Sequence, residues 1–454
     1  MGTATQVGAA VAVPGVRGVP LVALAKDPFG FCMRAAREGD GLVRLGAGPV
    51  RAYLVSHPDY VRHILVGNAA NYVKGSIMDG IRLALGNGLF TSDGDFWRRQ
   101  RRLMQPAFHT RQIQRMAETV AETVRASMAS WAPAVANGTP VDMLRESIRM
   151  NITIILETLF GTTVDEERSA RLLDLTDQVF AGMTRRVWTF FVPSWLPTPG
   201  AAAYRRSIEA LDQEIHALIA ARRAALADGD AWEDLLSALI QAEDPETGER
   251  MSDRQLRDEI FTMFLAGYES TAGGVTWAWH LLSQHPEAAA RLREEVDRVL
   301  GGRPPAYEDL PALTYTRRVV DETFRLYPAF PMYFRGSVED DVVGPYAIPG
   351  GANIIISPYA THHDPRHWDD PETFDPDRFA PERYDSRARE AYYPFGKGQR
   401  MCIGEPMSLT IAQLLIATIA QAYDVRTAPG VQVTGRYAMT YQPKNGLPVI
   451  LTRR

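Results

Sequence analysis

The chain has 454 residues, 46% of them hydrophobic, which is enough to bury a large core. Its formal net charge of −5 argues against a nucleic-acid partner, because proteins of that class usually carry a basic surface. Its two cysteines, Cys32 and Cys402, exclude a disulfide framework and also a built-in iron–sulfur cluster, which needs four ligands. We therefore expect a protein of the reducing cytoplasm.

The N-terminal residues 1–20 are interrupted by Pro14 and Arg17 and have neither a membrane span of about 20 apolar residues nor a basic signal-peptide start. We expect no membrane span and a loose N-terminal arm at about residues 1–13. The next pattern, from Leu42 to Val55, contains glycines and a proline between apolar runs and predicts two short strands.

A helical pattern then extends from about Asp95 to Ile240, with an aromatic, proline-rich loop from Trp188 to Pro199. A long apolar helix is predicted at about Asp253 to Ser283, and a charged helix at about Pro286 to Leu300.

Beyond Arg325 the chain becomes rich in proline, with ten of the 30 prolines between Pro328 and Pro394. Proline lacks an N–H group and fixes its φ angle, so this stretch predicts turns and short strands. A last helix is predicted at about Gly404 to Tyr423. Because there is no internal repeat or flexible linker, we expect a single domain over residues 1–454, mostly α with a small β region.

The ten residues that lead into this last helix read Phe-Gly-Lys-Gly-Gln-Arg-Met-Cys-Ile-Gly, from Phe395 to Gly404. Glycines allow a tight turn and a close approach to a flat cofactor, and a thiolate just before a helix is stabilised by the helix dipole. Arg400 can pair with a carboxylate on the edge of that cofactor. A buried structural cysteine is the alternative, but it does not require the surrounding pattern.

This pattern resembles the haem-binding signature of the cytochrome P-450 family, the haem-thiolate monooxygenases, and the resemblance extends from about Pro14 to Arg454. It implies the family's triangular helical prism enclosing haem b (protoporphyrin IX iron). Cys402 would be the metal ligand. The other cofactor-binding residues of the signature would be Phe395, Gly396, Arg400 and Gly404.

Glu322 and Arg325 resemble the family's E-x-x-R motif, and Arg378 matches its third partner. The resemblance implies a buried charge triad with a structural role. The same spacing occurs at Glu122/Arg125, Glu146/Arg149 and Glu295/Arg298, where we expect ordinary pairs on solvated helix faces.

Trp97 and Arg101 follow the family's W-x-x-x-R pattern, and residues four apart share a helix face. The resemblance implies that both bind a haem propionate and that Arg335 binds a propionate as well. A surface arginine cluster is the alternative, since Arg98, Arg99 and Arg102 are adjacent.

The segment from Ala266 to Thr271 resembles the family's A-G-x-D/E-T motif, which implies that Glu269 and a neighbouring hydroxyl deliver protons to bound dioxygen. Ser270 follows the acid where the family has threonine, and Thr271 comes one residue later, so either hydroxyl could serve the oxygen. A glycine inside a helix costs about 1 kcal/mol relative to alanine, and we expect Gly267 to open the helix for dioxygen. A helix bent by its Ser and Thr side chains is the alternative.

Three stretches match the family's substrate pocket, and their side chains are almost all apolar. These pocket residues are Ile77, Met78, Leu83, Ala266, Ala329, Phe330, Met332, Ala438 and Met439. The resemblance thus implies hydroxylation of a small lipophilic molecule, such as a terpenoid or polyketide of secondary metabolism or antibiotic biosynthesis, in one or several steps. No flavin domain is encoded, so electrons would come from a ferredoxin with its ferredoxin reductase.

Other functions remain open on the same resemblance. A fatty-acid hydroxylase would need a cation for the carboxylate, and Arg82 is the one candidate near the predicted pocket. A peroxygenase, isomerase or dehydratase would not need the acid–hydroxyl pair. A non-enzymatic haem sensor would not need it either.

Overall fold

The computed structural model describes residues 11–16, 27–45, 51–162, 166–189, 200–229, 234–244 and 246–454. The chain forms two compact units. The first unit combines residues 1–79, 330–373 and 384–402, and the second combines residues 80–329, 374–383 and 403–454. The expectation of one domain over the whole chain stays a prediction.

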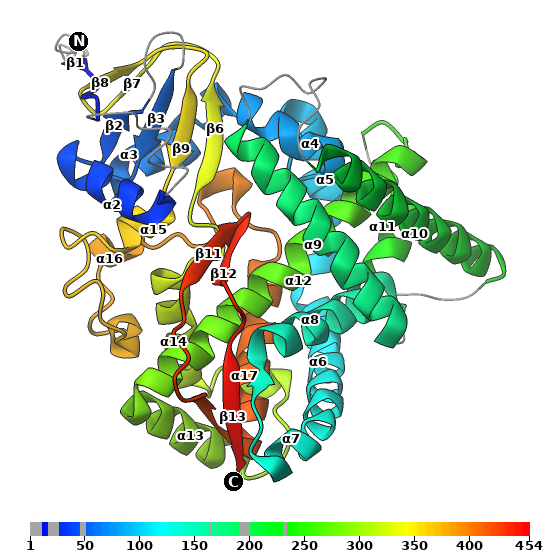
Figure 1. Ribbon diagram of the computed structural model, residues 1–454. Coiled ribbons are helices and arrows are strands. Elements are labelled where there is room, and N and C mark those ends of the chain that lie inside the picture. The colour runs from blue at the N-terminus through cyan, green and yellow to red at the C-terminus, as the bar shows by residue number, and fades with distance from the viewer. Residues whose placement is uncertain are drawn as a thin grey trace. The chain divides into compact units, whose positions relative to one another are not determined.

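A five-stranded sheet forms the centre of the first unit, with the strand order β2-β3-β9-β6-β4 (Figure 1). Its strands are β2 Leu42–Arg44, β3 Ala52–Val55, β4 Tyr72–Val73, β6 Tyr333–Ser337 and β9 Asn353–Ile356. The two strands predicted between Leu42 and Val55 are β2 and β3. β3 runs parallel to β9, which comes from the proline-rich part of the chain, and Val55 lies opposite Ile356.

A smaller sheet in the same unit contains β1 Val11–Ala12, β8 Tyr346–Ile348 and β7 Asp341–Val343. Here Val11 and Ala12 are paired with β8, and the Val11 N–H donates to the Pro345 carbonyl at 2.8 Å, where we expected loose chain. The helices and helical turns of this unit are α2 Pro28–Glu38, α3 Pro58–Arg62, η1 His63–Gly67, η2 Ala69–Asn71, η3 Ser76–Met78, α15 Pro358–His362, α16 Ser386–Ala391 and η7 Gly398–Arg400.

The second unit is built mainly of helices. They are α4 Asp79–Leu85, α5 Gly94–Met104, η4 Gln105–Phe108, α6 Thr110–Ser130, α7 Ala132–Asn137, α8 Met143–Phe160, α9 Glu166–Trp188, α10 Ala201–Ala227, α11 Leu235–Gln241, α12 Asp253–Gln284, α13 Pro286–Leu300, η5 Tyr307–Asp309, α14 Thr314–Leu326, η6 Pro376–Phe379 and α17 Glu405–Ala422. Its strands are β5 Val141–Asp142, β10 Tyr423–Thr427 and β13 Pro448–Arg453 in one sheet, and the hairpin β11 Gly435–Ala438 with β12 Thr440–Pro443.

The central helix of this unit is α12, which contacts both α8 and α14 (Figure 1). It begins at a capping box, in which the Gln255 N–H donates to Ser252 Oγ at 3.3 Å and the Ser252 N–H donates to Gln255 Oε1 at 2.9 Å. Its buried residues cover most of its circumference, as expected for a helix inside a core.

Glycines let the neighbours of α12 come close. A Cβ atom on Gly267 would lie 2.8 Å from Cδ1 of Ile155 on α8, and one on Gly274 would lie 2.4 Å from Cε1 of Phe324 on α14. Gly267 therefore has a packing reason as well, and its role as an opening for dioxygen stays a prediction.

The observed ends of a helix agree with the predicted ends where a proline or a glycine determines them. α13 begins at Pro286 and ends before Gly301, which has a φ of 57°, so its predicted bounds are confirmed.

One glutamate inside α13 does not lie where we expected it. Glu295 is buried and its carboxylate accepts the N–H groups of Tyr315 at 2.7 Å and Thr316 at 2.8 Å. Our expectation of a solvated pair at Glu295/Arg298 is wrong, because Glu295 holds the N-terminus of α14.

Two further sequence expectations concern the chain as a whole. Within the described ranges, none of the helices combines the length and the apolar composition that a membrane crossing requires. Most of the predicted aromatic loop from Trp188 to Pro199, from residue 190 onward, lies outside the described residues.

The close packing at Gly274 predicts a large effect of one methyl group. We expect Gly274→Ala to lower the free energy of unfolding by about 1–3 kcal/mol, because the added Cβ overlaps the Phe324 ring and overpacks the core. Gly67→Ala is the control, since no atom lies within 4 Å of the added Cβ. Thermal unfolding of the two variants measures the difference, and equal midpoints would contradict the packing argument.

Candidate active site

The loop that carries Cys402 lies in the first unit and is closed by its own backbone. The Cys402 N–H donates to the Phe395 carbonyl at 2.9 Å. Gly396 and Gly398 have φ angles of 78° and 71°, which favour glycine, and a Cβ on Gly398 would lie 2.2 Å from the Leu65 carbonyl oxygen. This geometry leaves Cys402 exposed and outside any disulfide.

Tyr333 on β6 supports this loop, and the sequence analysis missed it. Its hydroxyl donates to the Pro394 carbonyl at 2.6 Å, directly before the loop, and its ring lies 4.0 Å from a Cβ built on Gly396. Burial raises the pKa of Tyr333 well above its ordinary value, so the phenol stays a donor. The signal was its position two residues before Arg335, which places both side chains on one face of the strand.

The cationic residues of the first unit differ in burial. Arg335 on β6 is buried, and its guanidinium donates to the Phe334 carbonyl at 2.8 Å. Arg400 ends η7 and is half-buried. Gly404 is the N-cap of α17 with a φ of −88°, so its backbone conformation does not itself require glycine.

In the second unit, α5 carries the predicted Trp97 and Arg101. Trp97 is buried, and Arg101 is half-buried with its Nε donating to Gln105 Oε1 at 3.1 Å. The adjacent arginines are paired with acids, Arg98 with Asp95, Arg99 with Glu249 and Arg102 with Asp244. These pairs neutralise much of the arginine cluster around the motif.

One side of the predicted acid–hydroxyl segment of α12 is accessible to solvent. Ala266 is exposed although the residues before it are buried, and Ser270 is half-buried one turn later. The Ser270 hydroxyl donates to the Ala266 carbonyl at 2.8 Å. Thr271 is buried, and its Oγ1 lies 2.9 Å from Ser408 Oγ on α17. The two candidate hydroxyls therefore have different surroundings.

Glu269 lies inside the protein. It is 4% exposed, and its Oε2 has no hydrogen-bond partner among the described residues. Burial raises the pKa of Glu269 to about 8, although hydrogen bonds with Thr440 and Gln442 on β12 lower it in part. The carboxyl group is consequently protonated at neutral pH and can donate a proton.

The predicted pocket residues do not share one environment. Four of them, Ile77, Met78, Met332 and Met439, are buried, whereas Leu83 is 46% exposed. Ala329 and Phe330 are half-buried. Met439 is the single residue between β11 and β12, with a φ of 67° that a methionine rarely adopts. Ala438 belongs to β11, and its side chain lies outside the described part of the structure.

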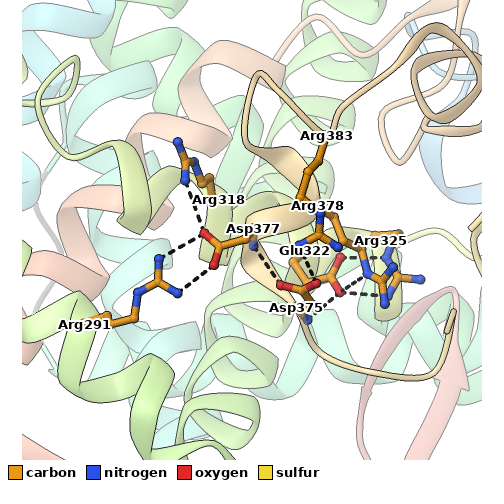
Figure 2. A network of polar contacts seen from close by, with 8 residues as sticks. All are labelled: Arg291, Arg318, Glu322, Arg325, Asp375, Asp377, Arg378 and Arg383. Carbon is orange, nitrogen blue, oxygen red and sulfur yellow. Dashed lines mark hydrogen bonds and ion pairs between the residues drawn. The ribbon is translucent and has the colours of Figure 1, made fainter. Parts of the chain in front are cut away.

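The charge triad is assembled around Glu322 (Figure 2). Arg325 donates through Nε to Glu322 Oε2 at 2.6 Å and through a terminal nitrogen to Oε1 at 2.8 Å. Arg378 Nε donates to Oε1 at 3.2 Å, and the Asp375 N–H donates to the same oxygen at 2.9 Å. Glu322 and Arg325 are both 0% exposed. Because Arg378 and Asp375 belong to the segment around η6, their hydrogen bonds with Glu322 tie this segment to α14.

The network continues beyond the three predicted residues (Figure 2). Asp375 pairs with Arg383 at 2.9 Å, and Asp377 pairs with Arg291 at 2.7 Å and with Arg318 at 3.3 Å. The pairs of Asp377 could not be predicted from local spacing, because Arg291 and Arg318 are far from it along the chain.

These side chains fit a haem-thiolate centre. The exposed Cys402 thiol offers a soft ligand, Arg335 and Arg400 offer cations for carboxylates, and the side of Gly396 has room, with no atom closer than 4.0 Å to an added Cβ. Considered by itself, the second unit exposes the apolar methyl group of Ala266 on α12. Thiolate, guanidinium and apolar contacts are the groups that a haem with propionates requires.

Comparison with known proteins identifies the family and the fold. A family model described as Cytochrome P450 matches residues 13–446. The chain is 37% identical to cyclooctat-9-en-7-ol 5-monooxygenase of Streptomyces melanosporofaciens over 91% of this chain and 89% of that protein. It is 36% identical to pentalenene oxygenase of Streptomyces avermitilis over 94% of each chain. The crystal structure of the cytochrome P450DA heme domain superposes with a TM-score of 0.88, at 25% identity and 98% coverage of both chains.

The burial of Glu322 predicts a severe effect of its removal. We expect Glu322→Ala to cost about 3–5 kcal/mol of stability, because Arg325 would be left as an unpaired buried charge. The yield of soluble protein and its urea unfolding midpoint measure this effect. Arg291→Gln is the control in the same network. Its side chain is 51% exposed, and we expect a loss below about 1 kcal/mol. A Glu322→Ala protein as stable as the control variant would refute the structural role.

Proposed function

The chain belongs to the cytochrome P450 family, and from this premise we propose that it hydroxylates a terpenoid with dioxygen at a haem b bound through Cys402. The family and its monooxygenase relatives establish the reaction class, an oxidoreductase that incorporates oxygen into a lipophilic substrate. The observation that carries the terpenoid assignment is the likeness, over more than 90% of this chain, to relatives named for cyclooctatin and pentalenene chemistry.

The proposed cofactor contacts are the residues that match the family's haem-binding motifs. Cys402 would provide the thiolate that holds the haem, with Phe395, Gly396 and Gly404 shaping its loop. Trp97, Arg101, Arg335 and Arg400 would bind the propionates. When bound, a thiolate-ligated haem supplies the cleavage of the O–O bond and the oxidation of the substrate. The protein contributes position, protons and exclusion of water.

Proton delivery is the task of α12. Glu269 holds a proton at neutral pH, and the Ser270 hydroxyl, bonded to the Ala266 carbonyl, lies on the open side of the helix. Thr271 is directed to Ser408 instead. These contacts favour Ser270 as the hydroxyl that passes protons to the oxygen, with Glu269 as the source.

The reaction needs electrons from a redox partner, as the family requires. We propose a ferredoxin with its reductase, in a reducing cytoplasm. The arginines of α5 would attract an acidic redox partner less than their number suggests, because Asp95, Asp244 and Glu249 pair with them.

A fatty acid is the nearest alternative substrate, and one contact counts against it. Arg82, the candidate to bind a fatty-acid carboxylate, donates to the Thr91 carbonyl at 3.1 Å and pairs with Asp93 at 3.6 Å. Binding a carboxylate there would require these contacts to break. An apolar substrate gains affinity from buried area alone, at about 25 cal/mol per Å² before association costs.

The substrate assignment is tested by turnover. The ferric protein is titrated with cyclic terpenes, macrolactones and fatty acids, and spin shifts in the Soret band report binding. Ligands that bind are then incubated with ferredoxin, reductase, NADPH and ¹⁸O₂. We expect a terpene to give a product carrying one ¹⁸O per hydroxylation. Binding and oxidation of fatty acids alone, lost in Arg82→Ala, would overturn the terpenoid assignment.

The two hydroxyls on α12 predict different mutant behaviour. We expect Ser270→Ala to keep haem and substrate binding while most of the NADPH consumed yields hydrogen peroxide in place of product, because the proton supply is interrupted. Thr271→Ala should keep its coupling, since its hydroxyl bonds to Ser408. Product and peroxide formed per NADPH measure both variants. If Thr271→Ala uncouples and Ser270→Ala does not, the assignment is reversed.

A further inference from the structure

A cleft of about 670 Å³ lies within the second unit, between α14 and α17. Its volume falls in the range of about 300–1,000 Å³ that is usual for small-molecule sites. The loop around η5 and the segment around η6 complete its walls. Among the described residues, none of those that match the family's substrate pocket lines this cleft. A molecule bound here would therefore be a second ligand, in addition to the substrate.

Much of the cleft surface is apolar. The apolar side chains come from the loop around η5, the segment around η6 and the first turns of α17. They are Leu310, Pro311, Phe379, Pro381, Pro406 and Leu409. These walls favour a ligand with an apolar body, because its binding removes apolar surface from water.

α14 contributes polar and charged side chains to the cleft. They are three and four positions apart and share one helix face. They are Thr314, Arg317, Arg318 and Asp321. Arg317 pairs with Asp321 at 2.8 Å. Arg318 pairs with Asp377 at 3.3 Å (Figure 2). Each guanidinium group on this wall therefore has a carboxylate partner.

Glu405 on α17 lines the opposite wall, and its charge is not balanced in this way. Its side chain is half-buried, and among the described residues its carboxylate has no hydrogen bond or ion pair. Burial raises the pKa of Glu405, the positive charge of Arg317 lowers it in part, and the negative charge of Asp321 raises it. A cation in the cleft would give this carboxylate a partner and favour its charged form.

Two buried polar side chains lie further along α17. Thr410 and Gln413 line the cleft and are 5% and 4% exposed. Gln413 Nε2 donates to the Leu409 carbonyl at 3.2 Å, whereas Gln413 Oε1 and the Thr410 hydroxyl have no hydrogen-bond partner among the described residues. Buried polar groups are normally hydrogen-bonded, so these two atoms can accept a donor from a ligand.

The acid and the buried acceptors lie at different positions along the cleft. Glu405 and Gln413 are eight residues apart, which corresponds to about 12 Å along an α-helix. A ligand that reaches both must therefore be elongated, with one charged end and one neutral polar end.

We propose that this cleft binds an elongated organic ammonium ion. The ammonium group bonds to the Glu405 carboxylate, and the apolar body packs against Phe379 and Leu409. A hydrogen-bond donor at the far end reaches the Thr410 hydroxyl and the Gln413 side-chain carbonyl. The site does not depend on the proposed hydroxylation, because binding requires no turnover.

Calorimetric titration of the haem-loaded ferric protein tests the site, with cyanide on the iron so that an amine cannot bind there. The probe is 4-(4-hydroxyphenyl)butylammonium, and the corresponding alcohol and carboxylate are its neutral and anionic analogues. We expect a Kd below about 1 mM for the ammonium probe and binding at least about tenfold weaker for both analogues. Equal affinities, or no binding of the ammonium probe at about 1 mM, would overturn the proposal.

A substitution at the acid then locates the bound probe. Glu405→Gln should weaken binding of the ammonium probe at least about tenfold, because a hydrogen bond between two charged groups is lost. Glu287→Gln is the matched control, since Glu287 is an exposed acid in the first turn of α13 and does not line the cleft. Unchanged affinity in Glu405→Gln, or an equal loss in the control, would overturn the proposal.

The far end of the ligand is tested at Thr410. Thr410→Val keeps the shape of the side chain and removes its hydroxyl group. We expect a loss of about two- to tenfold for the hydroxyphenyl probe and no loss for 4-phenylbutylammonium, which has no donor at that end. An equal effect on both compounds would overturn this orientation. The comparison of the three probes needs no variant, so it decides the proposal even where a variant fails to fold.

Discussion

A carboxylate without access to water needs compensating charge, and Glu322 is such a group at the centre of the second unit. Its two oxygens accept hydrogen bonds from Arg325, Arg378 and the Asp375 backbone. An isolated ion at this depth would be strongly destabilising, so the chain around residues 374–383 has to pass where its donors meet the carboxylate. A second buried acid, Glu295, holds the other end of α14. Two carboxylates from different parts of the chain thus set the position of one helix.

Much of this architecture could be predicted from the sequence, where local chemistry decides. Proline and glycine bound α13 at both ends, and a capping box begins α12. The loop from Phe395 to Cys402 was predicted from its residue pattern. Tyr333 was missed because its contact with Pro394 spans 61 residues and no spacing rule connects them.

Local sequence marked several unusual residues correctly but did not show what role each of them has in the fold. Gly267 attracted attention because glycine is unfavourable inside a helix, but its packing against Ile155 on α8 is a reason that local sequence cannot show. Glu295 had the spacing of a surface pair, yet α14 covers it. Glu269 was predicted as an acid, while its raised pKa depends on burial inside the fold, which outweighs the opposing hydrogen bonds with Thr440 and Gln442.

The hairpin of β11 and β12 constrains how this enzyme can diversify. One residue, Met439, connects the strands, and Ala438 lies opposite Thr440. Alternate side chains of a strand face opposite ways, so Thr440 and Gln442 share a side and Tyr441, whose ring contacts Trp277 at 5.4 Å, faces away. An insertion of one residue that shifts β12 would exchange these faces and remove the hydrogen bonds from Glu269. A change of the side chain at position 439 therefore leaves the register of β12 intact, whereas a change in the length of this turn alters acid chemistry on α12 at the same time.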